Sequence, residues 1–349
     1  MAHPRRIFAA AAAGLMDFVS SAGGDPGALL SAVGLDDRSL DDPRAVLDLG
    51  DYCRLMEQAA QETRNGNFGL DYGLQFQPEK LGPIAELVLA SPTVGMALEN
   101  LARYFPFHQQ VTETRLSVRG EWVQLDYRII DGRIMSRRQD AELTMGMFLN
   151  ILRRAFGPQW SPDTVHLEHP SPADSREHGS HFQAEVYFGQ RTNGIVFRCR
   201  DLSRPMPGCD LAAMARVREE LIRLTGGKGR LPLIEQVRGE LRSRLCEGEP
   251  AIETVAEALG LARWTLQRRL ADQGQSFASL LTSVRQQLAM AYLREPHLSV
   301  LDVSSLLGYS ETSAFSRAFA GWFNLSPTAV RTAVMASGDL ALTAGCTAL

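Results

Sequence analysis

Two clusters of side chains in the last third of the chain have the chemistry needed to read DNA bases. In the first cluster, Leu266 and Leu270 are four residues apart and would share the inner face of a helix. Arginine can pair with guanine, glutamine can pair with adenine, and an indole can pack on a thymine methyl group. The predicted DNA contacts lie on or beside the opposite face of this helix: Arg263, Trp264, Gln267 and Arg268.

The second cluster contains hydroxyl groups and a single arginine. Phe315 and Phe319 would face inward on a second helix, for which Ser310 is the predicted cap. The predicted DNA contacts of this helix are Thr312, Ser313, Ser316 and Arg317. Because bidentate side chains discriminate bases better than hydroxyls do, the first cluster is expected to dominate sequence recognition.

An internal repeat supplies the elements that would position both clusters. Its two copies are offset by 48 residues and read V-A-x-x-L-G from Val255 and V-S-x-x-L-G from Val303. Each copy predicts a helix, a tight turn opened by glycine, and a second helix. This is the pattern of a helix-turn-helix unit, in which the second helix enters the DNA major groove.

A predicted helix between the two copies sets their separation. Apolar residues recur at helical spacing from Phe277 to Tyr292, and the helix is expected over about 276–295. Its length would be roughly 30 Å at ~1.5 Å per residue, close to the ~34 Å of one DNA turn. A rigid spacer of this length could place both reading helices in successive major grooves. Ser299 and Asp302 predict a capping box at the start of the second copy.

Charge alone leaves a second interpretation open. The whole chain has a net charge of −4, and the region between Leu233 and Arg331 holds ten arginines and ten acidic residues. A helical bundle that binds another protein could have the same composition, whereas DNA binding needs local positive charge. Arg263, Arg268 and Arg269 supply that charge on the first reading helix. Together with the repeat and the spacer, they favour double-stranded DNA as the partner.

Residues 233–335 resemble the C-terminal DNA-binding domain of the AraC/XylS family of bacterial transcription regulators. The resemblance rests on WTLQRRL (264–270), SF (276–277), LGYSETSAFSRAF (307–319), SP (326–327) and Arg331. It implies that Trp264, Gln267, Arg268, Thr312, Ser313 and Arg317 occupy typical base-contacting positions. This sequence departs from the family pattern at Tyr309, where phenylalanine is usual, and at Asn324, where glycine is usual. Ala320-Gly321 replace a basic pair, which would weaken the phosphate contacts of the second unit.

Residues 5–210 resemble the effector-type domain of the ornithine-utilisation and VirS-like subgroup of the same family. The matching stretches are GALL (27–30), LG (81–82), SPT (91–93), 98–105 and RP (204–205). The resemblance implies a sensor of a small-molecule effector, and a domain through which the chain could form a homodimer. Together the two resemblances imply a ligand-responsive activator that acts with RNA polymerase at promoter DNA.

The hydrophobic periodicity predicts an α+β N-terminal sensor domain, with helices plus an antiparallel sheet, joined to an all-α C-terminal domain. Helical spacing dominates the first ~105 residues and predicts a first helix over 7–16. Alternation predicts a hairpin of 111–118 with 123–129, followed by a helix over 142–156. Short strands are expected at 164–167, 186–188 and 195–198. The predicted domains are 1–210 for sensing and dimerisation, 211–232 as a linker region, 233–335 for DNA binding, and 336–349 as a tail.

Aromatic residues gather in the middle of the N-terminal domain, where they could line an effector pocket. An apolar pocket with a few polar groups would use such side chains, but so would a hydrophobic core, and both interpretations stay open. The candidate effector-binding residues are Phe105, Phe107, His108, Trp122 and Tyr127.

Four of the seven histidines fall within 16 residues. Imidazoles are good ligands for zinc or nickel, although histidines scattered in loops are the alternative. A metal- or thiol-responsive repressor on the same architecture is therefore the second functional hypothesis. The candidate metal ligands are His166, His169, His178 and His181.

Several functional classes are not expected. The sequence has no G-x-S-x-G elbow, Walker A loop or dinucleotide fingerprint, so neither an enzyme nor a cofactor is predicted. Five cysteines without a C-x-x-C pair fit a reducing cytoplasm. No apolar run reaches the ~18 residues of a membrane span. Arg5-Arg6 before the apolar stretch 7–16 could suggest a signal peptide, but Asp17 and the amphipathic spacing that follows favour a helix of a domain.

Overall fold

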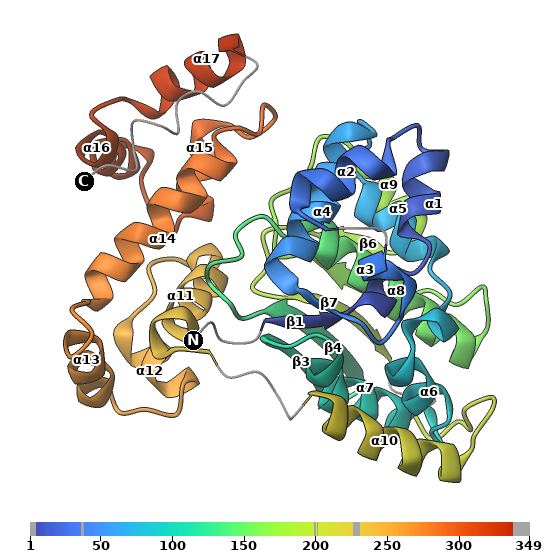
Figure 1. Ribbon diagram of the computed structural model, residues 1–349. Coiled ribbons are helices and arrows are strands. Elements are labelled where there is room, and N and C mark those ends of the chain that lie inside the picture. The colour runs from blue at the N-terminus through green and yellow to red at the C-terminus, as the bar shows by residue number, and fades with distance from the viewer. Residues whose placement is uncertain (1–4, 36–37, 199, 201, 226–230, 338–349) are drawn as a thin grey trace. The chain divides into compact units, whose positions relative to one another are not determined.

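The structure is a computed structural model that describes residues 5–35, 38–198, 200, 202–225 and 231–337 (Figure 1). The chain divides into two compact units, residues 1–232 and 233–349. Each unit has its own core and is described by itself below.

The first unit begins with a small two-stranded sheet and a group of helices. Strand β1 (Arg6–Phe8) pairs antiparallel with β2 (Val46–Asp48), and the turn Ala9–Ala12 follows β1. The predicted helix over 7–16 is therefore wrong, because backbone pairing with a segment 40 residues away overrides the local helical preference of the alanines. The helices are α1 (Leu15–Ser21), α2 (Pro26–Val33), α3 (Arg38–Asp41), α4 (Leu49–Glu62), α5 (Phe68–Gln75), α6 (Pro83–Leu89) and α7 (Val94–His108), with a 3-10 turn at Pro78–Leu81.

A five-stranded sheet forms the second layer of this unit, and α7 and α8 (Arg138–Phe156) pack on it. The strand order is β3-β4-β7-β5-β6, and all neighbours are antiparallel except the parallel pair β5–β6. The predicted hairpin is confirmed, with the turn at Gly120 in a left-handed conformation (φ 60°). The strands are β3 (Thr112–Arg119), β4 (Trp122–Ile129), β5 (Thr164–His166), β6 (Glu185–Tyr187) and β7 (Asn193–Arg198), and helix α9 (Arg176–Phe182) precedes β6.

Helices α5 and α8 approach so closely that glycine is needed between them. A Cβ atom on Gly73 would come within 2.5 Å of the Leu143 carbonyl oxygen, and one on Gly146 within 2.8 Å of Gly73. The close approach brings the N-terminal end of α8 into the core. There Glu57 of α4 is half-buried and accepts a hydrogen bond from the Gln139 backbone N–H at 3.0 Å. Burial raises the pKa of the Glu57 carboxyl to about 7, against an ordinary value of 4.5.

The raised pKa of Glu57 predicts a contribution to the stability of the first unit that is lost as the pH rises. The folded state holds the Glu57 proton more tightly than the unfolded chain does, so its contribution is fully present below pH 4.5 and is lost as the pH rises through about 7. The expected fall is on the order of 3 kcal/mol. Burial lowers the pKa of His108 to about 3, so His108 changes the stability in the opposite direction over this pH range, and the Glu57 contribution is read from a comparison of chains. Calorimetry at about pH 5 and about pH 8 should show that Glu57→Gln loses less stability with rising pH than the unchanged chain does, by this amount.

The control for this experiment is Glu62→Gln, which changes an exposed acid on the same helix and should keep the full fall. The stability of Glu57→Gln still depends on pH, because burial also raises the pKa of Asp140, to about 6. An equally steep fall in both variants would show that Glu57 is not its source.

Residues 211–225 form helix α10 (Leu211–Thr225), which packs against α6 and α7. The predicted linker region of 211–232 is therefore wrong for this stretch, because α10 buries an apolar face that includes Val217 and Leu221 in the core of the first unit. The glycine-rich part of the predicted linker, 226–230, lies outside the described residues. So do most of the predicted C-terminal tail and two of the five cysteines.

The second unit is entirely helical over 233–337 and contains two helix-turn-helix units on a shared helix (Figure 1). Helix α14 separates α12–α13 from α15–α16 and is shorter than the predicted 276–295. It has 16 residues, about 24 Å at ~1.5 Å per residue. The helices are α11 (Leu233–Arg244), α12 (Ile252–Ala258), α13 (Arg263–Ala271), α14 (Phe277–Tyr292), α15 (Val300–Leu306), α16 (Thr312–Phe323) and α17 (Pro327–Ser337).

No helix among the described residues is both long enough and apolar enough to span a bilayer.

Candidate DNA-binding surface

Helix α13 presents a polar and aromatic face to solvent. Gly260, in a left-handed conformation (φ 66°), opens the turn after α12, and α13 begins at Arg263. Leu266 and Leu270 are fully buried and anchor one side of the helix. On its other faces Arg263, Trp264, Gln267, Arg268 and Arg269 are all exposed, and 62% of Trp264 is accessible. A tryptophan this exposed has no role in the core of this unit, so it is available to a partner.

Two of the predicted DNA contacts on α13 touch each other. The Arg268 guanidinium lies over the Trp264 ring, 5.1 Å from its centroid. This cation–π contact orders two long side chains before any partner arrives, which lowers the entropy lost on binding. Arg263 instead pairs with Glu253 of α12, at 2.7 Å between guanidinium and carboxylate. Its contact with DNA therefore requires breaking a surface ion pair, which costs little.

The second helix-turn-helix unit, α15–α16, presents hydroxyl groups and one arginine beside an acidic side chain. The predicted capping box is present, because Ser299 and Asp302 exchange hydrogen bonds between side chain and backbone at the start of α15. Phe315 and Phe319 are fully buried, as predicted from their spacing. The N-cap of α16 is Glu311 rather than the predicted Ser310, and its side chain makes no capping hydrogen bond. The Ser313 hydroxyl donates to the Glu311 carboxylate at 3.0 Å.

Glu311 therefore places a negative charge where a DNA phosphate would approach α16. Ser313 is exposed but engaged by this acid, whereas Thr312 and Ser316 are half-buried and Arg317 is exposed. The Asn324 position ends α16 with a left-handed backbone (φ 55°), which asparagine tolerates better than other side chains. The exchange of the usual glycine for asparagine thus keeps the helix end.

Arg285, in the middle of α14, joins this helix to the turn between α15 and α16. Its Nε donates to the Leu307 carbonyl at 3.0 Å, and its guanidinium lies 4.3 Å from the Tyr309 ring centroid and 3.3 Å from a Glu249 carboxylate oxygen. Sequence reasoning missed this buried arginine, although an arginine directly after Val284 in an apolar stripe was the available signal. Arg285 sets how α15 and α16 sit on α14.

We expect Arg285→Met to destabilise the second helix-turn-helix unit, α15–α16, while α13 stays folded. Methionine keeps the apolar stem but leaves the Leu307 carbonyl without its donor, which costs roughly 1–3 kcal/mol for a buried acceptor. Hydrogen exchange of α15 and α16 peptides should accelerate more than that of α12 and α13. Arg294→Met, an exposed change beyond the end of α14, is the control. Unchanged exchange in α15 and α16 would contradict the assigned role of Arg285.

The five candidate effector-binding residues lie in or beside the core of the first unit. Phe105 and Tyr127 are buried and pack edge to face with Phe148, and the Tyr127 hydroxyl donates to Asp140 at 2.6 Å. His108 is also buried, and burial lowers its pKa to about 3, which keeps it neutral. Of the other two candidates, Phe107 is half-buried and Trp122 is exposed. None of the five lines either of two cavities in this unit, of about 770 and 330 Å³, so the geometry favours the core interpretation.

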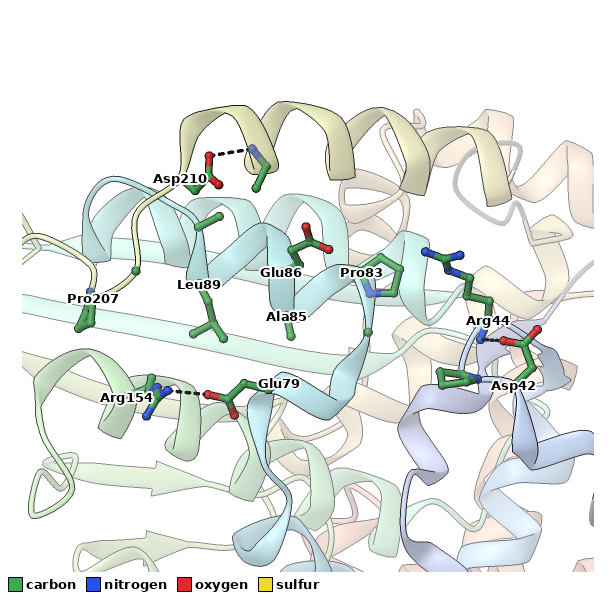
Figure 2. Close-up of a pocket in the computed structure, with 15 residues that line it drawn as sticks. Asp42, Arg44, Glu79, Pro83, Ala85, Glu86, Leu89, Arg154, Pro207 and Asp210 are labelled. Atoms are coloured by element: carbon green, nitrogen blue, oxygen red, sulfur yellow. Dashed lines mark hydrogen bonds and ion pairs between the residues drawn. The ribbon is translucent and has the colours of Figure 1, made fainter.

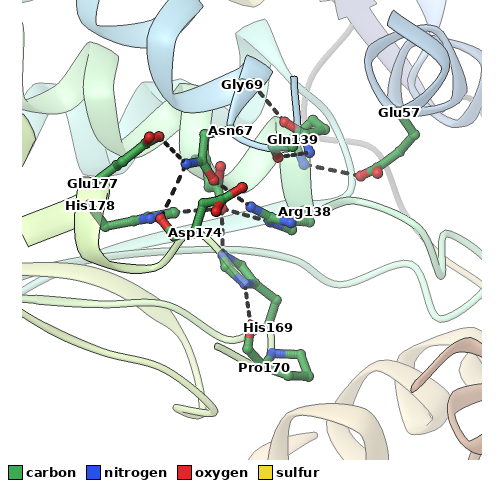
Figure 3. A network of polar contacts seen from close by, with 12 residues as sticks. Glu57, Asn67, Gly69, Arg138, Gln139, His169, Pro170, Asp174, Glu177 and His178 are labelled. Carbon is green, nitrogen blue, oxygen red and sulfur yellow. Dashed lines mark hydrogen bonds and ion pairs between the residues drawn. The ribbon is translucent and has the colours of Figure 1, made fainter. Parts of the chain in front are cut away.

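Two of the four candidate metal ligands meet, at a buried carboxylate (Figure 3). The Nε2 atoms of His178 and His169 lie 2.9 and 3.2 Å from the same oxygen of Glu142. Arg138 donates to that oxygen at 2.8 Å, and its positive charge opposes a metal ion there. Burial favours the neutral acid, but Arg138 and the two histidines hold the pKa of Glu142 well below its usual range.

The other two histidines lie apart from this pair. His181 lies beside Asp71 and His166 against the Tyr187 ring. Among the described residues no group of three or more potential ligands has metal-binding geometry. The four-histidine site is thus not assembled, and the network in Figure 3 ties α8 to the segments around α5 and α9.

The fold of the second unit and the exposed face of α13 define a DNA-binding helix-turn-helix protein. Comparison with known families matches residues 255–333 to a helix-turn-helix domain and residues 23–206 to the arabinose-binding domain of AraC transcription regulators, N-terminal type. The chain belongs to the AraC family of transcription regulators. The predicted resemblance is confirmed for both halves of the chain.

Several relatives match nearly the whole length of this chain. The HTH-type transcriptional regulator VirS of Mycobacterium tuberculosis is 27% identical over 317 residues, which cover 90% of this chain and 93% of VirS. The ornithine utilization regulator of Pseudomonas aeruginosa is 26% identical over 335 residues, with 91% and 94% covered. Among solved structures, the transcriptional regulator CdpR of Pseudomonas aeruginosa is 21% identical with a TM-score of 0.42, over 90% of this chain and 98% of CdpR. The chain is a DNA-binding transcription regulator of the same subgroup as VirS and the ornithine utilization regulator.

Proposed function

We propose that this regulator is a cytoplasmic, ligand-responsive activator that inserts α13 and α16 into successive major grooves of promoter DNA. The carrying observation is the second unit itself, in which α14 connects the helix pair α12–α13 to the helix pair α15–α16 (Figure 1). Arg285 joins α14 to the second helix-turn-helix unit, α15–α16, so the two reading helices act as one body. The proposed base and phosphate contacts are Arg263, Trp264, Gln267, Arg268, Thr312, Ser313, Ser316 and Arg317.

The first unit is the proposed sensor. Its match to an effector-type domain and its two cavities support a small-molecule ligand, which would act by shifting an equilibrium between arrangements of the chain. Dimerisation through this unit and contact with RNA polymerase belong to the same proposal. The proposal includes no catalytic role.

Selection from a pool of random duplexes with the full chain tests the DNA-binding part. We expect an enriched site with two conserved elements about 10 base pairs apart, centre to centre. Run-off transcription by bacterial RNA polymerase from a promoter carrying that site should then increase when the chain is added. A single conserved element would refute the two-groove arrangement, and reduced transcription would refute the assignment as an activator.

A further inference from the structure

A cavity of about 770 Å³ in the first unit lies where α10 meets the rest of the fold (Figure 2). Its lining comes from α6, from Arg154 near the end of α8, from the segment after α3, and from the start of α10. The apolar part of the lining includes Pro83, Ala85 and Leu89 of α6. A volume of this size suits a small organic ligand, because ligand pockets commonly span ~300–1,000 Å³.

The charges around this cavity are not balanced. Two arginines line it, and each already has a carboxylate partner: Arg154 pairs with Glu79 at 2.9 Å, and Arg44 pairs with Glu220 of α10 at 3.0 Å. Asp42 and Asp210 also line it and accept hydrogen bonds from backbone N–H groups, of Arg44 and of the first turn of α10, so the lining holds four carboxylates and two arginines. The lining side chains therefore carry an excess of negative charge, which favours a cationic ligand.

Two ion pairs at this cavity hold α10. Arg216 of α10 binds Glu86 of α6 at 2.8 Å, and the Arg44–Glu220 pair joins the segment after α3 to the same helix. Both Glu86 and Arg44 line the cavity. A cationic group bound there would therefore compete with Arg216 for the Glu86 carboxylate. Helix α10 is the last element of the first unit, and the DNA-binding unit begins at residue 233.

We propose that this cavity is the effector site, and that its ligand is a small organic cation, an amine or guanidine with a short apolar body. The inference rests on the proposed ligand-responsive function and adds its site and chemistry. The cation pairs with the acids of the cavity and weakens the Arg216–Glu86 contact, and the apolar body packs on α6. Occupancy of the cavity is thereby coupled to how firmly α10 is held.

The competition makes opposite predictions for the two partners of one ion pair. Calorimetric titration of the full chain with phenethylamine and with 1,5-diaminopentane should show binding, whereas 2-phenylethanol and 1,5-pentanediol should not bind. Glu86→Gln should weaken amine binding about threefold, because it removes an attractive charge at a partly exposed site. Arg216→Gln should strengthen amine binding by a similar factor, because it frees Glu86. Arg218→Gln, an exposed change on the same helix, is the matched control and should have no effect.

Each outcome decides the inference. Equal binding of amines and alcohols, or no binding of either amine, overturns it. Weakening by both Glu86→Gln and Arg216→Gln also overturns it, because that result indicates a purely structural ion pair. DNA binding is measured in the same samples with a duplex obtained by the selection above. A chain that selects DNA but does not bind amines refutes only the inferred site, whereas a chain that selects no DNA refutes the proposed function.

Discussion

Replacing Arg268 by alanine is expected to weaken binding to the selected DNA site by about 10- to 100-fold. An arginine that pairs with a guanine contributes ~1–3 kcal/mol of discrimination, and its loss relaxes the preference at that base position. Arg268 is exposed on α13 and is ordered by the Trp264 ring at 5.1 Å, so little entropy opposes the contact. Fluorescence anisotropy with the selected duplex and with a scrambled duplex measures both the affinity and the preference.

The scrambled duplex separates base reading from phosphate binding. A phosphate contact contributes to every sequence alike, and its loss lowers the dependence of binding on salt. Equal weakening on the selected and scrambled duplexes would therefore show that Arg268 holds the backbone only. Arg294→Ala, beyond the end of α14, is the matched control, because it removes one exposed arginine of the same unit outside both reading helices.

The same measurements test whether α13 dominates recognition. Trp264→Ala or Gln267→Ala should reduce selectivity more than Ser313→Ala or Ser316→Ala. The structure strengthens this expectation, because the Ser313 hydroxyl is already engaged by the Glu311 carboxylate at 3.0 Å. None of the four changes removes a charge, so the salt dependence should stay nearly constant. A greater loss of selectivity from the serine changes would reverse the ranking of the two helices.

The DNA-binding unit could be predicted from the sequence because its signals are local. Helical spacing places Leu266 and Phe315 inward and leaves Trp264 and Arg268 outward, and the structure has these orientations. The capping box of Ser299 was equally readable, because all of its atoms lie within one turn. The actual contacts with DNA remain predictions.

Features that depend on distant residues could not be predicted in this way. Strand β1 forms because it pairs with β2. Residues 211–225 were predicted as part of a linker, but they form α10, which packs on α6 and α7. Spacing along the chain likewise did not indicate that His169 and His178 would converge on Glu142, 36 residues from His178. The aromatic candidates could not be assigned from the sequence for a related reason, since residues such as Phe105 and Tyr127, which are buried here, suit a core and a pocket equally well.

Inserting about 5 base pairs between the two elements of the selected site should reduce binding to that of a site with only the first element. Half a turn of B-DNA is ~5 base pairs, so the insertion moves the second major groove to the opposite side of the duplex. Helix α16 cannot reach the displaced groove, because α14 is a continuous helix of 16 residues and Arg285 joins the second helix-turn-helix unit to the middle of α14. Anisotropy with the inserted duplex measures the loss, which we expect to be roughly tenfold from the modest contacts of α16.

Two further duplexes make this test decisive. A duplex with a scrambled second element and no insertion should bind as weakly as the inserted one, because both leave α16 without its groove. An insertion of about 10 base pairs restores the side of the helix but adds ~34 Å of separation. A rigid α14 of about 24 Å cannot span that addition, so the longer insertion should not restore binding. Recovery of binding with the 10-base-pair insertion, or full binding with the 5-base-pair insertion, would mean that the two helix-turn-helix units are joined flexibly and that α14 does not set their spacing.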